Sequence, residues 1–172
     1  MQTVAVTDQV HQRNQTIEDE IRHAARYTGT GVLITADSVA TVKHLARRIH
    51  TASGHTTSPF VQAAAADLPN DKTVINKAWT DLFEAARGGT LLVTTIEHMP
   101  LVVQEHLIEK SLNARVSLQR AQRVRLIAGT TTNLYERVIQ GAFSERLFYQ
   151  LNTIHVVARH ATAAGDRWSE NS

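Results

Sequence analysis

The sequence predicts an α/β domain in which helices cover both faces of a parallel sheet. Short apolar runs, such as Val32–Thr35 and Thr90–Ile96, are typical of strands that are buried on both faces. Segments with helical periodicity alternate with these runs; in the segment 42–49, apolar residues recur at i, i+3, i+4 and i+7. Such alternation implies parallel strands joined by right-handed crossovers.

The predicted elements follow one another with short connections. The expected order is a helix over about 16–27, a strand at 32–35, a helix that ends near 53–54, a strand from 59, a helix over 75–86, a strand at 90–96, a helix from 100, a strand at 124–128, a helical stretch at 134–151 broken at Gly141, and a strand at 153–157. We therefore expect one domain over residues 16–160, with a flexible N-terminus at 1–15 and a flexible tail at 161–172.

Composition narrows the class of protein further. With 172 residues, of which 42% are hydrophobic, the chain can bury the core of one domain without additional cross-links. It has no cysteine, which excludes disulfides and thiolate chemistry and fits a reducing compartment. No apolar run approaches the roughly 20 residues of a membrane span, and the N-terminus lacks a secretory signal. We expect a cytoplasmic protein that does not bind membranes.

Three stretches of the chain carry a family resemblance: Val32–His50, Phe83–Leu107 and Arg125–Asn152. The first ends in Ala-Arg-Arg-Ile-His, the second contains Arg-Gly-Gly-Thr-Leu-Leu-Val, and the third contains Leu-Ile-Ala-Gly-Thr. In their order and spacing they resemble the ATPase core, or AAA+ domain, of the bacterial sigma-54-dependent transcription activators. The resemblance implies a three-layer α/β/α fold of the P-loop NTPase type, with a five-stranded parallel sheet of strand order 5-1-4-3-2.

The same resemblance indicates which parts of the family are missing here. The family contacts the sigma factor with a Gly-Ala-Phe-Thr-Gly-Ala loop, and the roughly 14 residues between Pro69 and Phe83 leave no room for it. Contact with sigma-54 is therefore not expected. We also expect no helical lid domain and no DNA-binding helices after the fifth strand.

Residues that handle the nucleotide in this family are replaced. The family's phosphate loop, Gly-Glu-Ser-Gly-Thr-Gly-Lys, cradles phosphate with backbone amides and a lysine. The seven matching positions are Ala36, Asp37, Ser38, Val39, Ala40, Thr41 and Val42. β-Branched residues resist the positive φ that glycine allows, and Val42 continues the apolar face of a helix. Lys43 is one residue late, about 100° further around that helix, and is a poor substitute for the lysine.

The other positions for nucleotide chemistry are also changed. Thr94 and Thr95 replace the Walker B carboxylates, and a hydroxyl neither holds magnesium strongly nor acts as a base. Thr131 replaces the sensor asparagine, while Ser144 and Gln150 replace the two arginines that would stabilise phosphate across a subunit interface. We therefore expect no ATPase activity, no catalytic residues and no bound cofactor.

Two more site hypotheses concern charge and metal. One segment without acidic residues contains four arginines: Arg115, Arg120, Arg123 and Arg125. These side chains could contact nucleic acid or an acidic partner. A solvent-exposed edge before a buried strand would explain the same four arginines without any such contact. The nine histidines show no spacing typical of zinc sites, so no metal is expected.

The leading hypothesis is a non-hydrolysing relative of the sigma-54 activator core that binds another protein in transcriptional regulation. In a first alternative, the domain still binds ATP and magnesium and completes a ring with catalytically intact partners. In a second alternative, the arginine segment makes the chain a weak nucleic-acid binder. The sequence leaves open the identity of the protein partner and whether the chain forms a homo-oligomer.

Overall fold

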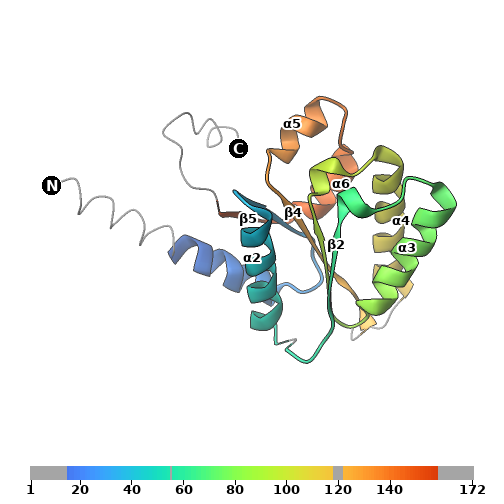
Figure 1. Cartoon of the computed structure of the whole chain (residues 1–172). Helices are drawn as coiled ribbons and strands as arrows, with labels where there is room; N and C mark the ends of the chain where they lie inside the picture. Colours follow the sequence, from blue (N-terminus) through green and yellow to red (C-terminus); the bar gives the residue numbers. More distant parts are fainter. Residues whose placement is uncertain (1–14, 55, 118–121, 159–172) are drawn as a thin grey trace.

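A computed structural model of the chain describes residues 15–54, 56–117 and 122–158, with the backbone alone at 112–117. Figure 1 shows a central twisted sheet with helices on either side. A helix over residues 15–26 comes first. The elements that follow are β1 (Val32–Ala36), α2 (Val39–Ala52), β2 (Phe60–Ala64), α3 (Lys72–Ala85), β3 (Thr90–Thr94), α4 (Leu101–Ser117), β4 (Arg125–Thr130), α5 (Leu134–Ile139), α6 (Glu145–Leu151) and β5 (Ile154–Ala158).

All five strands are parallel, and their order in the sheet is β2-β3-β4-β1-β5. This is the predicted order, and β3, β4 and β1 are adjacent and buried, as expected. The register pairs Leu33 of β1 with Ala128 of β4, and Leu91 of β3 with Leu126 of β4. The fold class predicted from the sequence is therefore confirmed.

The sheet separates two hydrophobic cores, because successive side chains of a strand point to opposite faces. Leu91 of β3 belongs to the core covered by α3, α4 and α6, in which Trp79 is the largest fully buried side chain. Leu92, the next residue, belongs to the core covered by α2 and the first helix. Consecutive apolar residues in a central strand thus supply side chains to the cores on both faces of the sheet.

Side-chain caps define where the longer helices begin. The Ser38 hydroxyl caps α2, and the Asp71 carboxylate caps α3 by accepting hydrogen bonds from the N–H groups of Thr73 and Val74. Such caps satisfy amides that the helix leaves unpaired. The predicted break at Gly141 is present, since α5 and α6 are two short helices on either side of it.

None of the described helices is both long and apolar enough to cross a membrane. The described residues fall within the expected domain at 16–160, apart from residue 15. Its limits stay a prediction, because 1–14 and 159–172 lie outside the described residues.

Candidate functional site

The phosphate-loop, Walker B and sensor positions gather at the carboxyl edge of the sheet, the edge at which open α/β sheets bind ligands. Asp37 and Ser38 follow β1, Thr94 ends β3, and Thr131 follows β4. Because β3, β4 and β1 are hydrogen-bonded neighbours, the fold brings these three segments to the same edge.

The junction at the phosphate-loop position is short, and two of its amides are already engaged. Two residues, Asp37 and Ser38, connect β1 to α2, so the loop positions 39–42 are helical. The Thr41 N–H donates to the Ser38 hydroxyl oxygen at 3.1 Å, and the Val42 N–H donates to the Ser38 carbonyl oxygen at 3.1 Å. Both amides therefore belong to the first turn of α2.

Val42, at the position of the family's lysine, is part of the core. It is buried beside Gly129 of β4, where a Cβ atom on the glycine would lie 2.2 Å from Val42 Cγ1. The valine at one position thus requires the glycine at the other. Lys43, the neighbouring residue, is exposed on the surface of α2.

The two Walker B positions form hydrogen bonds within the protein. Thr94 is buried, and its hydroxyl donates to the Ala63 carbonyl oxygen of β2 at 3.4 Å. The Thr95 hydroxyl donates to the Thr94 carbonyl oxygen at 2.7 Å. Thr95 has φ 52° and is the sole non-glycine residue with positive φ in the part of the chain that the structure describes. This left-handed backbone, strained for a β-branched residue, turns the chain into the short 3₁₀ helix Ile96–His98.

A buried carboxylate, Glu97, follows this turn. Only 2% of the residue is exposed, and its Oε1 atom accepts hydrogen bonds from the N–H and the hydroxyl of Thr131 at 3.2 and 3.0 Å. Arg137 Nη2 donates to the Glu97 carbonyl oxygen at 3.1 Å. The Oε2 atom is buried without a hydrogen-bond partner among the described residues. A buried carboxyl group therefore lies beside the sensor position.

Sequence reasoning missed Glu97 as a site residue. The available signal was a single acidic residue between the apolar Ile96 and the Met99–Pro100 pair. Acidic residues are almost never fully buried unless they are paired. Nothing in the local sequence indicates that the chain turns this side chain inward, because its partner Thr131 lies 34 positions later.

The two arginine positions serve the internal structure of α6. Ser144 caps this helix by accepting a hydrogen bond from the Leu147 N–H, and its own N–H donates to the buried Gln104 side chain at 2.7 Å. The Gln150 side-chain amide donates to the Ser111 hydroxyl. Gln150 lies near Gly31, which precedes β1, so it belongs to the opposite edge of the sheet from Ser38.

The arginine segment does not form the predicted patch of four side chains. Arg125 is 4% exposed, and its guanidinium donates to the Ala24 carbonyl oxygen and the Ser53 hydroxyl. Burial lowers the pKa of Arg125 to about 10. Including Arg125 in an exposed patch was therefore wrong; Arg123 is exposed. Arg120 and the side chain of Arg115 lie outside the described residues.

Within the described ranges, no group of three or more His, Asp or Glu residues is arranged to hold a metal ion.

The parallel sheet, its strand order and its carboxyl-edge junctions define a P-loop NTPase-like fold of the AAA+ type. The fold agrees with that of the P-loop NTPase domain of the Sigma-54 transport activator from E. coli, with a TM-score of 0.58 at 21% identity over 81% of this chain and 98% of that chain. Residues 73–157 match the family model of the Sigma-54 interaction domain. Over this part the chain belongs to that family, and the predicted family is confirmed.

Longer transcription regulators are among the relatives. Regulatory protein AtoC of Escherichia coli K12 is 35% identical over 144 residues, which is 73% of this chain and 31% of AtoC. DNA-binding transcriptional regulator NtrC of the same organism is 34% identical over 143 residues, which is 73% of this chain and 30% of NtrC. The chain thus spans less than a third of the length of these relatives.

Some similar structures were solved with nucleotide. NtrX from Brucella abortus in complex with ATP has a TM-score of 0.71 at 26% identity, over 86% of this chain and 37% of that chain. Together the comparisons make this chain a homologue of the sigma-54 activator AAA+ domain and link it to transcriptional regulation.

Proposed function

We propose that this chain is a non-hydrolysing domain of the sigma-54 activator type that acts as a protein-binding module in transcriptional regulation. One observation carries the proposal: phosphate-loop amides that would cradle phosphate close the first turn of α2 instead. The Thr41 N–H is held by the Ser38 hydroxyl, and the Val42 N–H by the Ser38 carbonyl oxygen. An amide that completes a helix turn is not available to a ligand.

The side chains at the other positions support the same proposal. Thr94 and Thr95 offer hydroxyls where magnesium needs carboxylates, and both hydroxyls already donate to carbonyl oxygens of the protein. Losing general-base assistance typically lowers a rate by about 10² to 10⁴, and losing one preorganised charge-stabilising donor by about 10² to 10³. Such losses need not add, but any two of them would bring turnover below routine detection.

Glu97 occupies space beside the sensor position. Its Oε1 atom accepts hydrogen bonds from the N–H and the hydroxyl of Thr131 at 3.2 and 3.0 Å. Both donors of Thr131 are therefore engaged within the protein, which supports weak or absent nucleotide binding.

Exposed apolar side chains on α5 and α6 support a role in protein binding. Tyr135 and Ile139 lie one helical turn apart on α5, and Ile139 is 71% exposed. Phe148 of α6 connects them to the exposed Tyr149, with ring centroids 5.7 Å from Tyr135 and 5.5 Å from Tyr149. Tyrosine is enriched at protein interfaces. Contact with sigma-54 is not part of the proposal, because α3 (Lys72–Ala85) runs as an uninterrupted helix through the region where the family's loop would lie.

Two measurements test the proposal. Phosphate release and titration calorimetry with ATP and ADP, with magnesium present, should show neither turnover nor binding. Affinity purification from a cell extract, followed by mass spectrometry, should recover a protein that is lost with Ile139→Ser but retained with the matched control Val74→Ser, since Val74 is also exposed but lies on α3. Equal recovery with both variants would contradict a binding surface on α5 and α6.

The ATP-binding alternative is favoured by one observation, the similarity to NtrX solved with ATP. Under this alternative, wild-type protein binds ATP, and Lys43→Ala weakens that binding because this lysine is exposed close to the phosphate-loop positions. Turnover in wild-type protein that Lys43→Ala abolishes would replace the non-hydrolysing proposal.

A further inference from the structure

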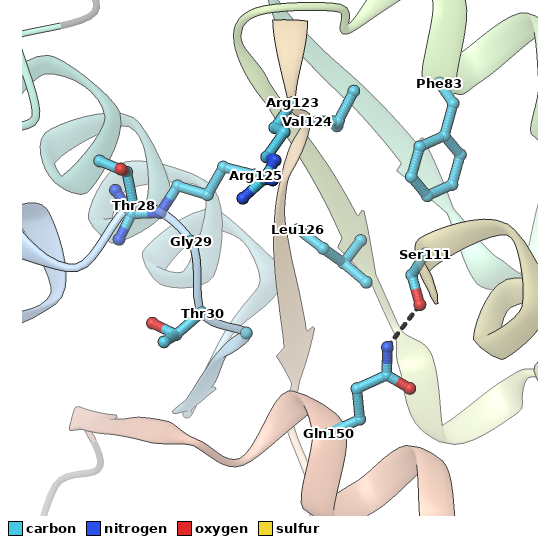
Figure 2. Close-up of a pocket in the computed structure, with 11 residues that line it drawn as sticks. Thr28, Gly29, Thr30, Phe83, Ser111, Arg123, Val124, Arg125, Leu126 and Gln150 are labelled. Atoms are coloured by element: carbon cyan, nitrogen blue, oxygen red, sulfur yellow. Dashed lines mark hydrogen bonds between the residues drawn. The ribbon is translucent and has the colours of Figure 1, made fainter. Parts of the chain in front are cut away.

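A small cavity opens at the amino edge of the sheet, opposite the candidate nucleotide positions. Its volume is about 90 Å³, and it lies where β1 and β4 begin (Figure 2). The loop Thr28–Gly31 forms one wall, and the segment Arg123–Leu126 forms another. Side chains of Phe83, Ser111 and Gln150 complete the lining.

The lining of this cavity carries positive charge without negative charge. Arg123 and Arg125 both line it, and no aspartate or glutamate does. Among the residues that the structure describes, no carboxylate forms an ion pair with Arg125. Its described partners are the neutral Ala24 carbonyl oxygen and Ser53 hydroxyl, and its Nε atom is buried without a hydrogen-bond partner. A guanidinium has five N–H donors, so donors remain for a ligand.

The burial of Arg125 is costly for its charged form. Desolvation lowers the pKa of Arg125 to about 10, and no charge among the described residues offsets this effect. A buried charge is stabilised when an opposite charge pairs with it. An anion beside Arg125 would therefore supply a stabilisation that the protein itself does not.

Shape and wall chemistry limit the size of the anion. Gly31 lies so close to α6 that a Cβ atom would be 2.3 Å from the Gln150 carbonyl oxygen, which closes the cavity on that side. Figure 2 shows Arg125 reaching toward the loop at Thr28 and Gly29, while the hydrogen-bonded pair of Ser111 and Gln150 lies on the other side. The cavity, of about 90 Å³, has room for a small oxyanion.

We propose that this cavity binds a small oxyanion, a phosphate or a carboxylate group, between Arg123 and Arg125. Guanidinium groups match the geometry of both oxyanions, since they donate parallel N–H bonds to two oxygens. The site goes beyond the proposed function, because it lies on the opposite edge of the sheet from the phosphate-loop positions, and its arginines are not part of the apolar surface on α5 and α6.

The test is a titration of the whole chain with inorganic phosphate, followed by amide NMR at constant ionic strength. Saturable shifts are expected at the amides of Thr28–Gly31, with no such shifts when sodium chloride replaces phosphate. Arg123→Gln should weaken binding about tenfold, because one of two charge-assisted contacts is lost. Arg87→Gln is the control, since it removes the same charge from an exposed arginine that pairs with Glu84 and is not among the residues that line the cavity.

A second measurement uses thermal stability in place of amide shifts. Phosphate should raise the melting temperature of wild-type protein and of Arg87→Gln, and should raise that of Arg123→Gln less. A parallel titration with acetate separates the two ligand classes: saturation by acetate alone identifies a carboxylate site, and saturation by phosphate alone a phosphate site. Shifts that never saturate, or an equal loss of binding in Arg87→Gln and Arg123→Gln, would overturn the proposal.

Discussion

At the scale of single residues, Val42 and Gly129 pack tightly against each other. Val42 lies at the family's lysine position, and its side chain fills the space beside the glycine backbone of β4. A long cationic side chain would have to leave this space to reach a phosphate. The pair therefore fixes the path of the first turn of α2 across the carboxyl edge of the sheet.

Gly129→Ala should lower the free energy of unfolding by about 1–3 kcal/mol, because the new Cβ atom overlaps with Val42 and a packed core resists added volume. Val42→Ala creates the missing space, so the double variant should cost at least about 0.5 kcal/mol less than the sum of the two single variants. Urea unfolding of the four proteins measures this coupling. Costs that add would show that the two residues do not share the space.

At the scale of elements, α2 depends on its first turn. Ser38 caps the helix, and four apolar residues attach it to the sheet, namely Val42, Leu45, Ala46 and Ile49. The absence of acidic residues from this first turn leaves the Ser38 hydroxyl as the main side-chain partner of its amides. The residue that corresponds to a phosphate-loop serine thus has a structural role that does not require a nucleotide.

Ser38→Ala should therefore destabilise the domain by about 1 kcal/mol, the usual cost of losing a helix cap. Ser38→Asp should restore most of this stability, because a carboxylate accepts the same N–H bond and interacts favourably with the helix N-terminus. Urea midpoints of the three proteins measure both effects, with no nucleotide present. A neutral Ser38→Ala together with a destabilising Ser38→Asp would contradict the capping role.

At the scale of the whole molecule, one sheet joins two hydrophobic cores. Leu91 and Leu92 are consecutive residues of β3 and are both fully buried, but they pack into different cores. Every central strand contributes to both cores in this way. Loss of packing on one face should therefore loosen the sheet on which the other face depends.

Leu91→Ala and Leu92→Ala should each lower the free energy of unfolding by about 2–5 kcal/mol, the range for a leucine truncated in a core. Each variant should still unfold in a single transition, with the same urea midpoint by circular dichroism and by tryptophan fluorescence. The two leucines serve as matched controls for each other. Two separate transitions in either variant would show that the cores are independent.

The sequence by itself determined the fold class, the sequence of elements and the family. Strand and helix periodicity are local properties, so the runs at 32–35 and 90–96 predict strands without knowledge of their neighbours. The strand order came from the family resemblance, and the sheet has that order. The substitutions at Val42, Thr94 and Thr95 could also be read directly, because each lies within a recognisable motif.

Only the tertiary structure decided where the charged side chains of Arg125 and Glu97 lie. Arg125 looked like part of a basic surface, but it is buried because it meets Ala24 and Ser53, which lie 101 and 72 positions away. Glu97 is turned inward by the strained backbone at Thr95 and by Thr131, 34 positions later. Contacts between such distant positions leave no periodic signal in the sequence, because they depend on how the elements pack and not on local backbone preference.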